Sequence, residues 1–230
     1  MPPKLTSLLV GRDNSEIIRD EIAAILLVEQ EHQQTLAVAE SEDPLKWKLR
    51  IFTERSNPWS EFVAAPDSDT VDATPIVNVG FESVTYDPSK SDPIHRQQAT
   101  GIYNIDCYTY GVSEDAPTGH IPGDEMAAID ALRAARLVRQ ILMSAHYRYL
   151  GLPRGIVGNR WPQSIRVVQP QIEGKAVQHV VAARIAFEVT FNEFSPQHEG
   201  EPLELISFGV FRKETGELYF TADYGESEDS

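Results

Sequence analysis

The stretch at residues 179–195, HVVAARIAFEVTFNEFS, decides the fold because its residues alternate over an unusually long distance. One set of alternate positions is entirely apolar: Val181, Ala183, Ile185, Phe187, Val189 and Phe191. The positions between them include Arg184, Glu188, Thr190 and Asn192. An alternation of period two is typical of a strand that is buried on one face. We therefore predict a long strand whose apolar face lies on the core, and whose polar face has no catalytic geometry.

The segments around this strand predict an α+β fold. Helical spacing of apolar residues indicates one helix from about residue 13 and another from residue 123 to the break near residue 151. Alternation predicts further strands at residues 47–54, 75–86, 99–112 and 165–174. Because strands cluster instead of alternating with helices, we expect a mainly antiparallel or mixed sheet with two helices packed on one face. Two last strands, LISFGVF and ELYFTADY, predict a C-terminal β-hairpin with its turn around Gly216.

Both helices carry boundary and packing signals. Asp13 and Glu16 have the spacing of a capping box at the start of the first helix. The second helix is rich in alanine, so we expect it to lie close to the sheet. Its expected core stripe is Ala128, Ala131, Leu132, Ala135, Val138 and Leu142.

The length of 230 residues is consistent with one elaborate domain. We expect a single α+β domain over residues 1–225, interrupted by a long, proline-rich connection at 55–75 with a short element near residues 59–64. Residues 226–230 are expected to form an acidic, disordered tail.

Composition narrows the function classes. The net charge is −15 and the sequence pI is about 4.8. Such an acidic surface repels phosphates, which disfavours binding in the grooves of nucleic acid. The same repulsion would keep a polyanion from adhering to the wall of a channel through which it passes. No apolar run approaches the ~18–20 residues of a membrane span, and the N-terminus lacks the core of a secretory signal, so we expect folding in the cytoplasm and no membrane partner. A single cysteine, Cys107, excludes a disulfide within the chain.

A search for chemistry predicts no catalytic, cofactor-binding or metal-binding residue. The six histidines show none of the spacings of a metal site. Cys107 sits within a predicted strand, where a buried apolar role fits better than a nucleophile. GLPRGIVGNR at 151–160 has glycines but no following Gly-Lys-Ser/Thr, so a helix-to-strand connection explains it better than a phosphate cradle.

Five charged residues are candidates for contact with a neighbouring subunit: Arg133, Arg136, Arg139, Arg184 and Glu188. The three helix arginines recur every third residue and so share one broad face. They could be solvated or paired within the chain, they could meet acidic groups of a neighbour, or they could touch nucleic acid. The sequence leaves these three alternatives open.

The chain resembles one protein family in the order and texture of its segments. The resemblance covers most of residues 13–195 and rests on ERSNPWSEF at 54–62, the segment PIVNVGFESVTYDPSKSDPIHRQQATGIYNIDCYTYGV at 75–112, the long Ala/Arg-rich helix, and AARIAFEVTFNE at 182–193. These segments are similar to the neck and tail-completion proteins of long-tailed bacteriophages, in particular the tail terminators. The family has no short catalytic motif, so the resemblance carries over regions and no site residues.

The resemblance implies a structural virion protein without cofactor or catalysis. Tail terminators are small α+β proteins that form a ring, commonly a hexamer, which caps the tail tube and docks onto the head connector while DNA passes through its lumen. The expected partners are thus further copies of this chain, tube proteins and connector proteins. The expected location is the virion, after assembly in the host cytoplasm.

Two alternatives remain open. The chain could be another neck, connector, baseplate or tube-initiation component of a phage. It could also be an enzyme or a small-molecule-binding domain in which Tyr103, Tyr108, Tyr110 and His120 line a pocket.

Overall fold

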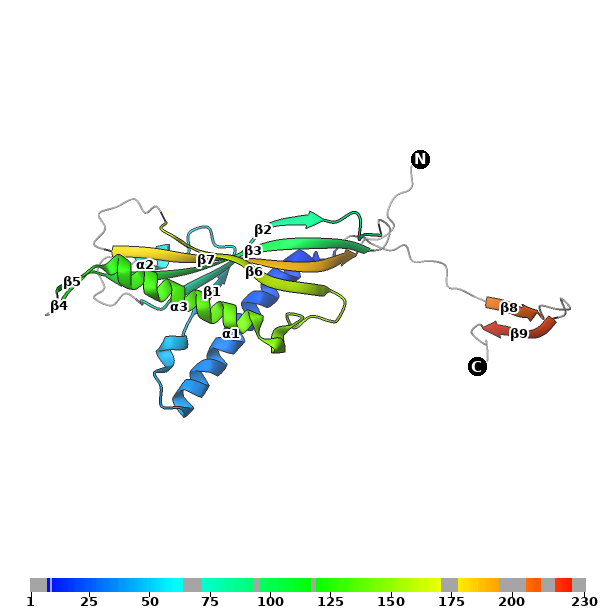
Figure 1. The fold of residues 1–230 in the computed structure, drawn as a ribbon, viewed down its shortest axis with the longest axis horizontal. Helices are drawn as coiled ribbons and strands as arrows, with labels where there is room; N and C mark the ends of the chain where they lie inside the picture. The colour runs from blue at the N-terminus through cyan, green and yellow to red at the C-terminus, as the bar shows by residue number, and fades with distance from the viewer. Residues whose placement is uncertain are drawn as a thin grey trace. The chain divides into compact units, whose positions relative to one another are not determined.

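Five strands form one mixed sheet in the order β1-β2-β3-β7-β6 in a computed structural model of the chain (Figure 1). Residues 8, 10–63, 72–92, 96–116, 119–170, 178–194, 206–211 and 218–224 are described. Strand β1 (Arg50–Thr53) runs parallel to β2 (Ile76–Tyr86), and every other pair in this sheet is antiparallel. The remaining strands of the sheet are β3 (Arg96–Val112), β6 (Val157–Val168) and β7 (Gln178–Phe194). The expected α+β fold with a mixed sheet is confirmed.

The chain divides into two units, Met1–Ser195 and Pro196–Ser230. The first unit holds the sheet, the helices, and a small antiparallel pair of β4 (Glu114–Ala116) and β5 (Gly119–Ile121). The second unit holds β8 (Ile206–Phe211) and β9 (Leu218–Tyr224), which pair antiparallel as the expected hairpin. The turn around Gly216 and the acidic tail lie outside the described residues. The single domain over 1–225 stays a prediction.

Strand β7 lies inside the sheet, paired along its whole length with β3 and over residues 182–191 with β6. Its apolar face is at most 1% exposed from Val181 to Phe191 and packs with the helices in one core, as the alternation predicts. β3 contributes Tyr103, Ile105 and Cys107 to the same core. A strand paired on both edges and covered on one face buries every second side chain, which is why the long apolar alternation was visible in the sequence.

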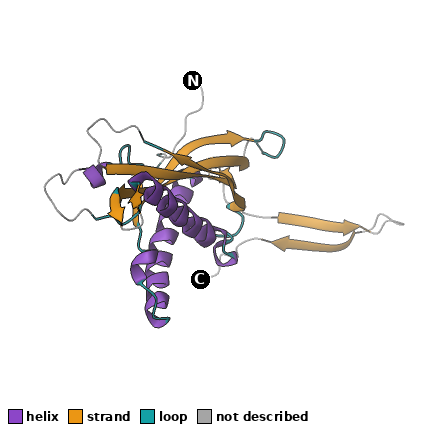
Figure 2. Cartoon of the chain, turned by 60° about the vertical axis from the view of Figure 1, so that its left-hand side comes forward, coloured by secondary structure: helices purple, strands orange, loops and turns teal. Residues whose placement is uncertain are grey.

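Two long helices cover that apolar face, α1 (Asn14–Ala39) and α3 (Gly123–Met143), and Figures 1 and 2 show both on the same side of the sheet. The short helix α2 (Ser60–Val63) lies on the opposite face, where Phe62 packs with Ile76, Tyr108 and Val180. This cover buries one end of the second face and accounts for the aromatic residues on both faces of β3. Within the expected 55–75 connection, α2 is the short element, and residues 64–71 lie outside the described part.

The sheet supplies a capping group for each long helix. The Glu193 carboxylate of β7 accepts hydrogen bonds from the backbone N–H groups of Asn14 and Ser15, both at 3.0 Å, at the start of α1. The Arg160 guanidinium of β6 donates to the carbonyls of Leu142 and Ser144, at 2.9 and 2.7 Å, at the end of α3. Helix ends leave such groups without partners inside the helix, so these two contacts fix where each helix meets the sheet.

The predicted capping box is wrong, although the helix starts where it was expected. Asp13 is the N-cap residue, but its side chain makes no cap hydrogen bond. Glu193, 180 positions along the chain, occupies that role instead, and sequence spacing cannot show a partner so distant.

Three further expectations need correction. α3 ends at Met143 and is followed by the 3-10 turns Ala145–Tyr147, so it is shorter than predicted. β1 covers only Arg50–Thr53 of the strand expected at 47–54, and a 3-10 helix, Pro44–Trp47, precedes it. β6 starts at Val157, within the segment that was interpreted as a connection. The sequence did not show this start, because Pro162 and two bulges interrupt the edge strand and its alternation of polar and apolar residues is lost.

Candidate subunit interface

Helix α3 has its small residues inside and several large apolar residues outside. Alanines 127, 131, 134 and 135 are buried against the sheet. Met126, Ile129 and Leu132 are 45%, 54% and 46% exposed. The expected core position of Leu132 is therefore wrong. Spaced three residues apart, these side chains form one stripe on the outer surface. We call this stripe, with Arg133 and Arg136, the α3 outer face.

A close contact between β3 and the start of α3 explains why the small residues of α3 face the sheet and its larger apolar residues face outward. A Cβ atom placed on Gly111 would lie 2.1 Å from the backbone oxygen of Gly123, so only glycine allows this approach. The Thr109 hydroxyl also donates to the carbonyl of Ala127 at 2.6 Å. A helix held this near a sheet has room for alanine beneath it, and its larger apolar side chains are left at the surface.

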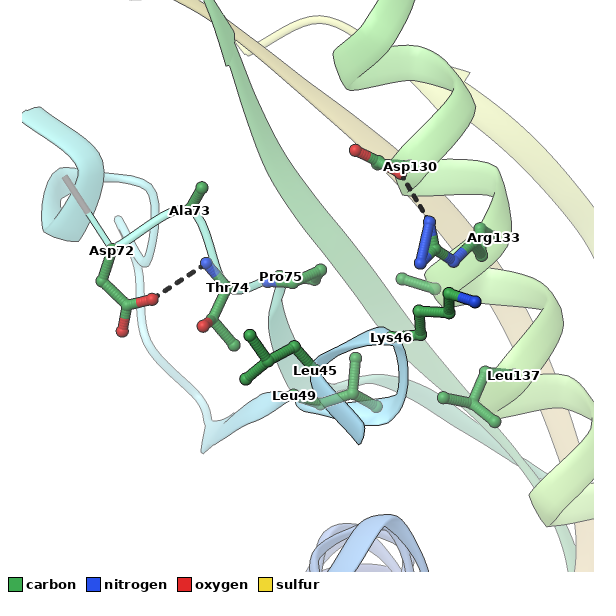
Figure 3. Close-up of a pocket in the computed structure, with 11 residues that line it drawn as sticks. Leu45, Lys46, Leu49, Asp72, Ala73, Thr74, Pro75, Asp130, Arg133 and Leu137 are labelled. Atoms are coloured by element: carbon green, nitrogen blue, oxygen red, sulfur yellow. Dashed lines mark hydrogen bonds and ion pairs between the residues drawn. The ribbon is translucent and has the colours of Figure 1, made fainter. Parts of the chain in front are cut away.

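The three helix arginines differ in their surroundings. Arg133 donates to Asp130 at 3.1 Å, one turn back on the same helix, and borders a cavity of about 340 Å³ (Figure 3). That cavity lies between α3, the 3-10 helix Pro44–Trp47 and the segment 72–75. Arg136 is exposed and Arg139 is half-buried, and neither forms an ion pair with another described residue. Among the described residues, Arg133 is thus the one of the three with an ion-pair partner in its own chain, and the three alternatives for these arginines stay open.

Arg184 is held within its own chain. Its guanidinium makes a bidentate contact with Asp106 on β3, at 2.7 and 2.8 Å, and Asp106 is only 4% exposed. The Tyr108 hydroxyl donates to the same carboxylate at 3.1 Å. The Asp106 hydrogen bonds raise the pKa of Arg184, and burial beside Asp106 raises the pKa of Tyr108. A planar fork on a buried carboxylate is a strong contact, and it leaves the rest of the guanidinium at the surface, since the Arg184 side chain is 41% exposed.

The Arg184 partner was missed by sequence reasoning because it depends on register. Asp106 and Arg184 stand directly opposite each other in the β3–β7 pairing, and Glu188 stands opposite Trp161 of β6. Glu188 accepts a hydrogen bond from Gln163. The Asp in IYNIDCYTYG was visible in the sequence, but its 78-residue separation from Arg184 gave no signal of pairing.

Of the two end strands of the sheet, β6 carries exposed apolar residues, whereas the apolar residues of β1 are half-buried. β6 exposes Trp161, Ile165, Val167 and Val168, and its outer edge pairs with no other strand among those described. At the other end, α1 and β1 enclose a shallow cavity of about 340 Å³. Its lining includes Leu27, Ile51 and Phe52. Unpaired edges and apolar surfaces of this kind mark places where another chain can bind.

The aromatic residues proposed for a small-molecule pocket do not come together. Tyr103 lies on the helix-covered face and donates to the Ser15 carbonyl at 3.0 Å. Tyr108 lies on the opposite face, beside Trp59, and Tyr110 stacks on Phe62. Since the sheet separates Tyr103 from the other two, these tyrosines cannot line one pocket.

Within the described residues, no group of three or more His, Cys, Asp or Glu side chains could hold a metal ion. Cys107 is fully buried, and that burial raises the pKa of its thiol. Across the same part of the chain, no helix has both the length and the apolar character needed to cross a membrane.

A scan against protein-family models finds no match for this chain, and a search of curated proteins finds no significant relative. The resemblance to phage tail terminators therefore stays a prediction from the sequence.

Proposed function

We propose that this chain is a structural virion protein of a long-tailed phage, forming a terminator ring at the end of the tail tube. The ring would join the tube to the head connector, with DNA passing through its lumen. Another neck, connector or baseplate component of such a phage is the second candidate, because the same ring architecture would serve there.

The observation that carries this proposal is the exposed apolar edge of β6 at one end of the sheet, with the shallow apolar cavity between α1 and β1 at the other end. β1 and β6 are the end strands of the sheet, so their exposed surfaces lie at opposite ends of the strand order. A contact between the β6 edge of one copy and the β1 edge of the next is head-to-tail, and such a contact closes into a ring when the rotation is right. The net charge of −15 supports a lumen along which DNA slides without binding.

The test combines mass measurement with binding to tube ends. The full chain should assemble into a ring, seen by light scattering and electron microscopy, and should bind the ends of purified tail tubes. Trp161→Glu, on the β6 edge, should abolish the ring while the circular dichroism spectrum is retained. Val38→Glu, at an apolar position on α1 that is also exposed, is the matched control and should leave assembly intact.

A chain that stays monomeric at all concentrations and never binds tube ends would refute the ring. Rings found at the distal end of the particle, instead of at the neck, would favour the baseplate alternative.

A further inference from the structure

A cavity of about 600 Å³ lies between α1, α3 and the 3-10 segments Pro44–Trp47 and Ala145–Tyr147. This volume is within the range of small-molecule pockets, which is roughly 300–1,000 Å³. All of the residues that line it belong to the first unit. We call it the Glu29 cavity, and its lining includes Glu29, His32, Trp47, Leu137, Ile141 and Tyr147.

Glu29 supplies a charge that no Lys or Arg in the described part of the chain compensates. Its side chain is 18% exposed, and its carboxylate accepts hydrogen bonds from the Gln33 amide and the Tyr147 hydroxyl, both at 2.8 Å. His32 Nδ1 lies 3.6 Å from Oε1 of Glu29, and that contact is an ion pair only when the imidazole is protonated. Burial by itself would raise the pKa of Glu29, but the hydrogen bonds from Gln33 and Tyr147 outweigh it and hold this pKa below its ordinary value. The carboxylate is therefore ionised at neutral pH.

The Glu29 carboxylate still has capacity for another donor. A carboxylate offers about four lone-pair sites, and the two hydrogen bonds from neutral groups leave about half of them open. A charge that is partly removed from water costs free energy unless an opposite charge lies beside it. Because Glu29 lines the cavity, a cation bound there would supply the missing partner.

The remaining walls suit the body of an organic cation. Trp47 and Tyr147 are half-buried and line the cavity from the two 3-10 segments. The face of an aromatic ring attracts ammonium and guanidinium groups, and the indole ring does so most strongly. Leu137 and Ile141 of α3 add apolar surface. None of the described residues that line the cavity is Lys or Arg, so at pH 8, where histidine is normally neutral, no lining charge repels a cation.

A metal ion is a poorer occupant of this cavity. In the described part of the chain, no three His, Cys, Asp or Glu side chains come together as metal ligands. Hard cations such as Ca²⁺ and Mg²⁺ are bound by several oxygen atoms. One carboxylate beside two aromatic rings fits an organic cation better.

We propose that the Glu29 cavity binds a small organic cation, an ammonium or guanidinium group on an aliphatic chain. Glu29 is its counter-ion, Trp47 and Tyr147 pack on the cationic group, and Leu137 and Ile141 contact the chain. This site goes beyond the structural role proposed above and does not depend on ring assembly.

The test is fluorine NMR of the full-length chain at pH 8, with 5-fluorotryptophan at its three tryptophans. Trp47→Phe assigns the Trp47 signal, and Trp59 and Trp161, which do not line the cavity, are internal controls. Butylguanidinium should shift the Trp47 signal saturably and leave the other two unmoved. Butylurea, its neutral isostere, should bind about tenfold more weakly or worse, because it cannot form a charge-assisted hydrogen bond with Glu29.

Glu29→Gln keeps an oxygen acceptor for the Tyr147 hydroxyl and removes the charge, so it should weaken butylguanidinium binding by about tenfold or more. Glu31→Gln is the matched control: it lies at an exposed position of α1 outside the cavity, changes the net charge equally, and should leave the affinity unchanged. Equal losses in the two variants would overturn the proposal, because the overall acidity of the chain would then explain the binding. Equal affinity for butylurea, equal shifts of all three tryptophan signals, or no saturable shift would overturn it as well.

Discussion

Replacing Glu193 with alanine tests how helix α1 is anchored to the sheet. The Glu193 side chain is 8% exposed and is the acceptor for the first two backbone N–H groups of α1. The variant leaves these donors without a partner inside the protein. Asp13→Ala is the matched control, because Asp13 holds the N-cap position without making a cap hydrogen bond.

The expected loss follows from two opposing effects. Removing a side-chain cap costs about 0.5–2 kcal/mol, and hydrogen bonds to a charged group contribute about 1.5–3 kcal/mol each. Against this, the variant no longer buries a carboxylate, and that burial raises the pKa of Glu193 above its usual value near 4.5. We expect Glu193→Ala to lower the free energy of unfolding by about 2 kcal/mol, and Asp13→Ala by about 0.5 kcal/mol or less.

The raised pKa also predicts the direction of a pH effect. The folded state holds the Glu193 proton more tightly than the unfolded chain does. Its contribution to stability is therefore full below about pH 4.5 and is lost as the pH rises through the raised pKa. Glu193→Gln removes this titration, so its cost relative to the unsubstituted chain should shrink over that pH window.

Urea unfolding, followed by circular dichroism at a series of pH values, measures all three variants. An Asp13→Ala cost equal to or larger than that of Glu193→Ala would refute the assignment of the cap to β7. A cost for Glu193→Gln that grows with pH would refute the pKa direction.

Three further predictions follow from packing. Gly111→Ala places a Cβ 2.1 Å from a backbone oxygen of α3 and should lower the free energy of unfolding, measured in urea, by about 3 kcal/mol. Gly80→Ala is the control: a Cβ there would lie 3.7 Å from its nearest neighbouring atom, so this variant should cost about 1 kcal/mol or less. Equal costs for the two variants would contradict the close approach of β3 and α3. Asp106→Ala leaves the Arg184 guanidinium without its carboxylate partner and should lower the free energy of unfolding by about 2 kcal/mol. This is less than the loss for a fully buried pair, because Arg184 still reaches water. An unchanged midpoint of urea unfolding would show that the pair contributes nothing. Cys107 should react with a thiol reagent only after denaturant is added, and rapid labelling of the native chain would contradict its burial.

Strand β7 shows what could be predicted from sequence. Its alternation predicted a long strand and identified the face that α1 and α3 cover, because burial on one side of a strand repeats with the same period as the side chains. The β2 and β3 segments were predicted for the same reason, and the first helix was predicted from the helical spacing of its apolar residues. Fold class followed from their order.

The candidate interface depended on tertiary structure. The sequence indicated five charged candidates, Arg133, Arg136, Arg139, Arg184 and Glu188. Only strand register showed that Arg184 pairs with Asp106. No pattern indicated that Leu132 would face outward, since the helical period gives an amphipathic stripe without telling which side meets the sheet.

The sequence by itself determined where the two long helices and the strands β2, β3 and β7 lie, because local periodicity acts over a few positions. The tertiary structure decided what those elements touch: the β7 carboxylate on the start of α1, the glycine contact that turns alanines inward on α3, and the exposed apolar edge of β6. These contacts join residues far apart in the chain, so they depend on strand order, register and approach distance, which no local pattern contains.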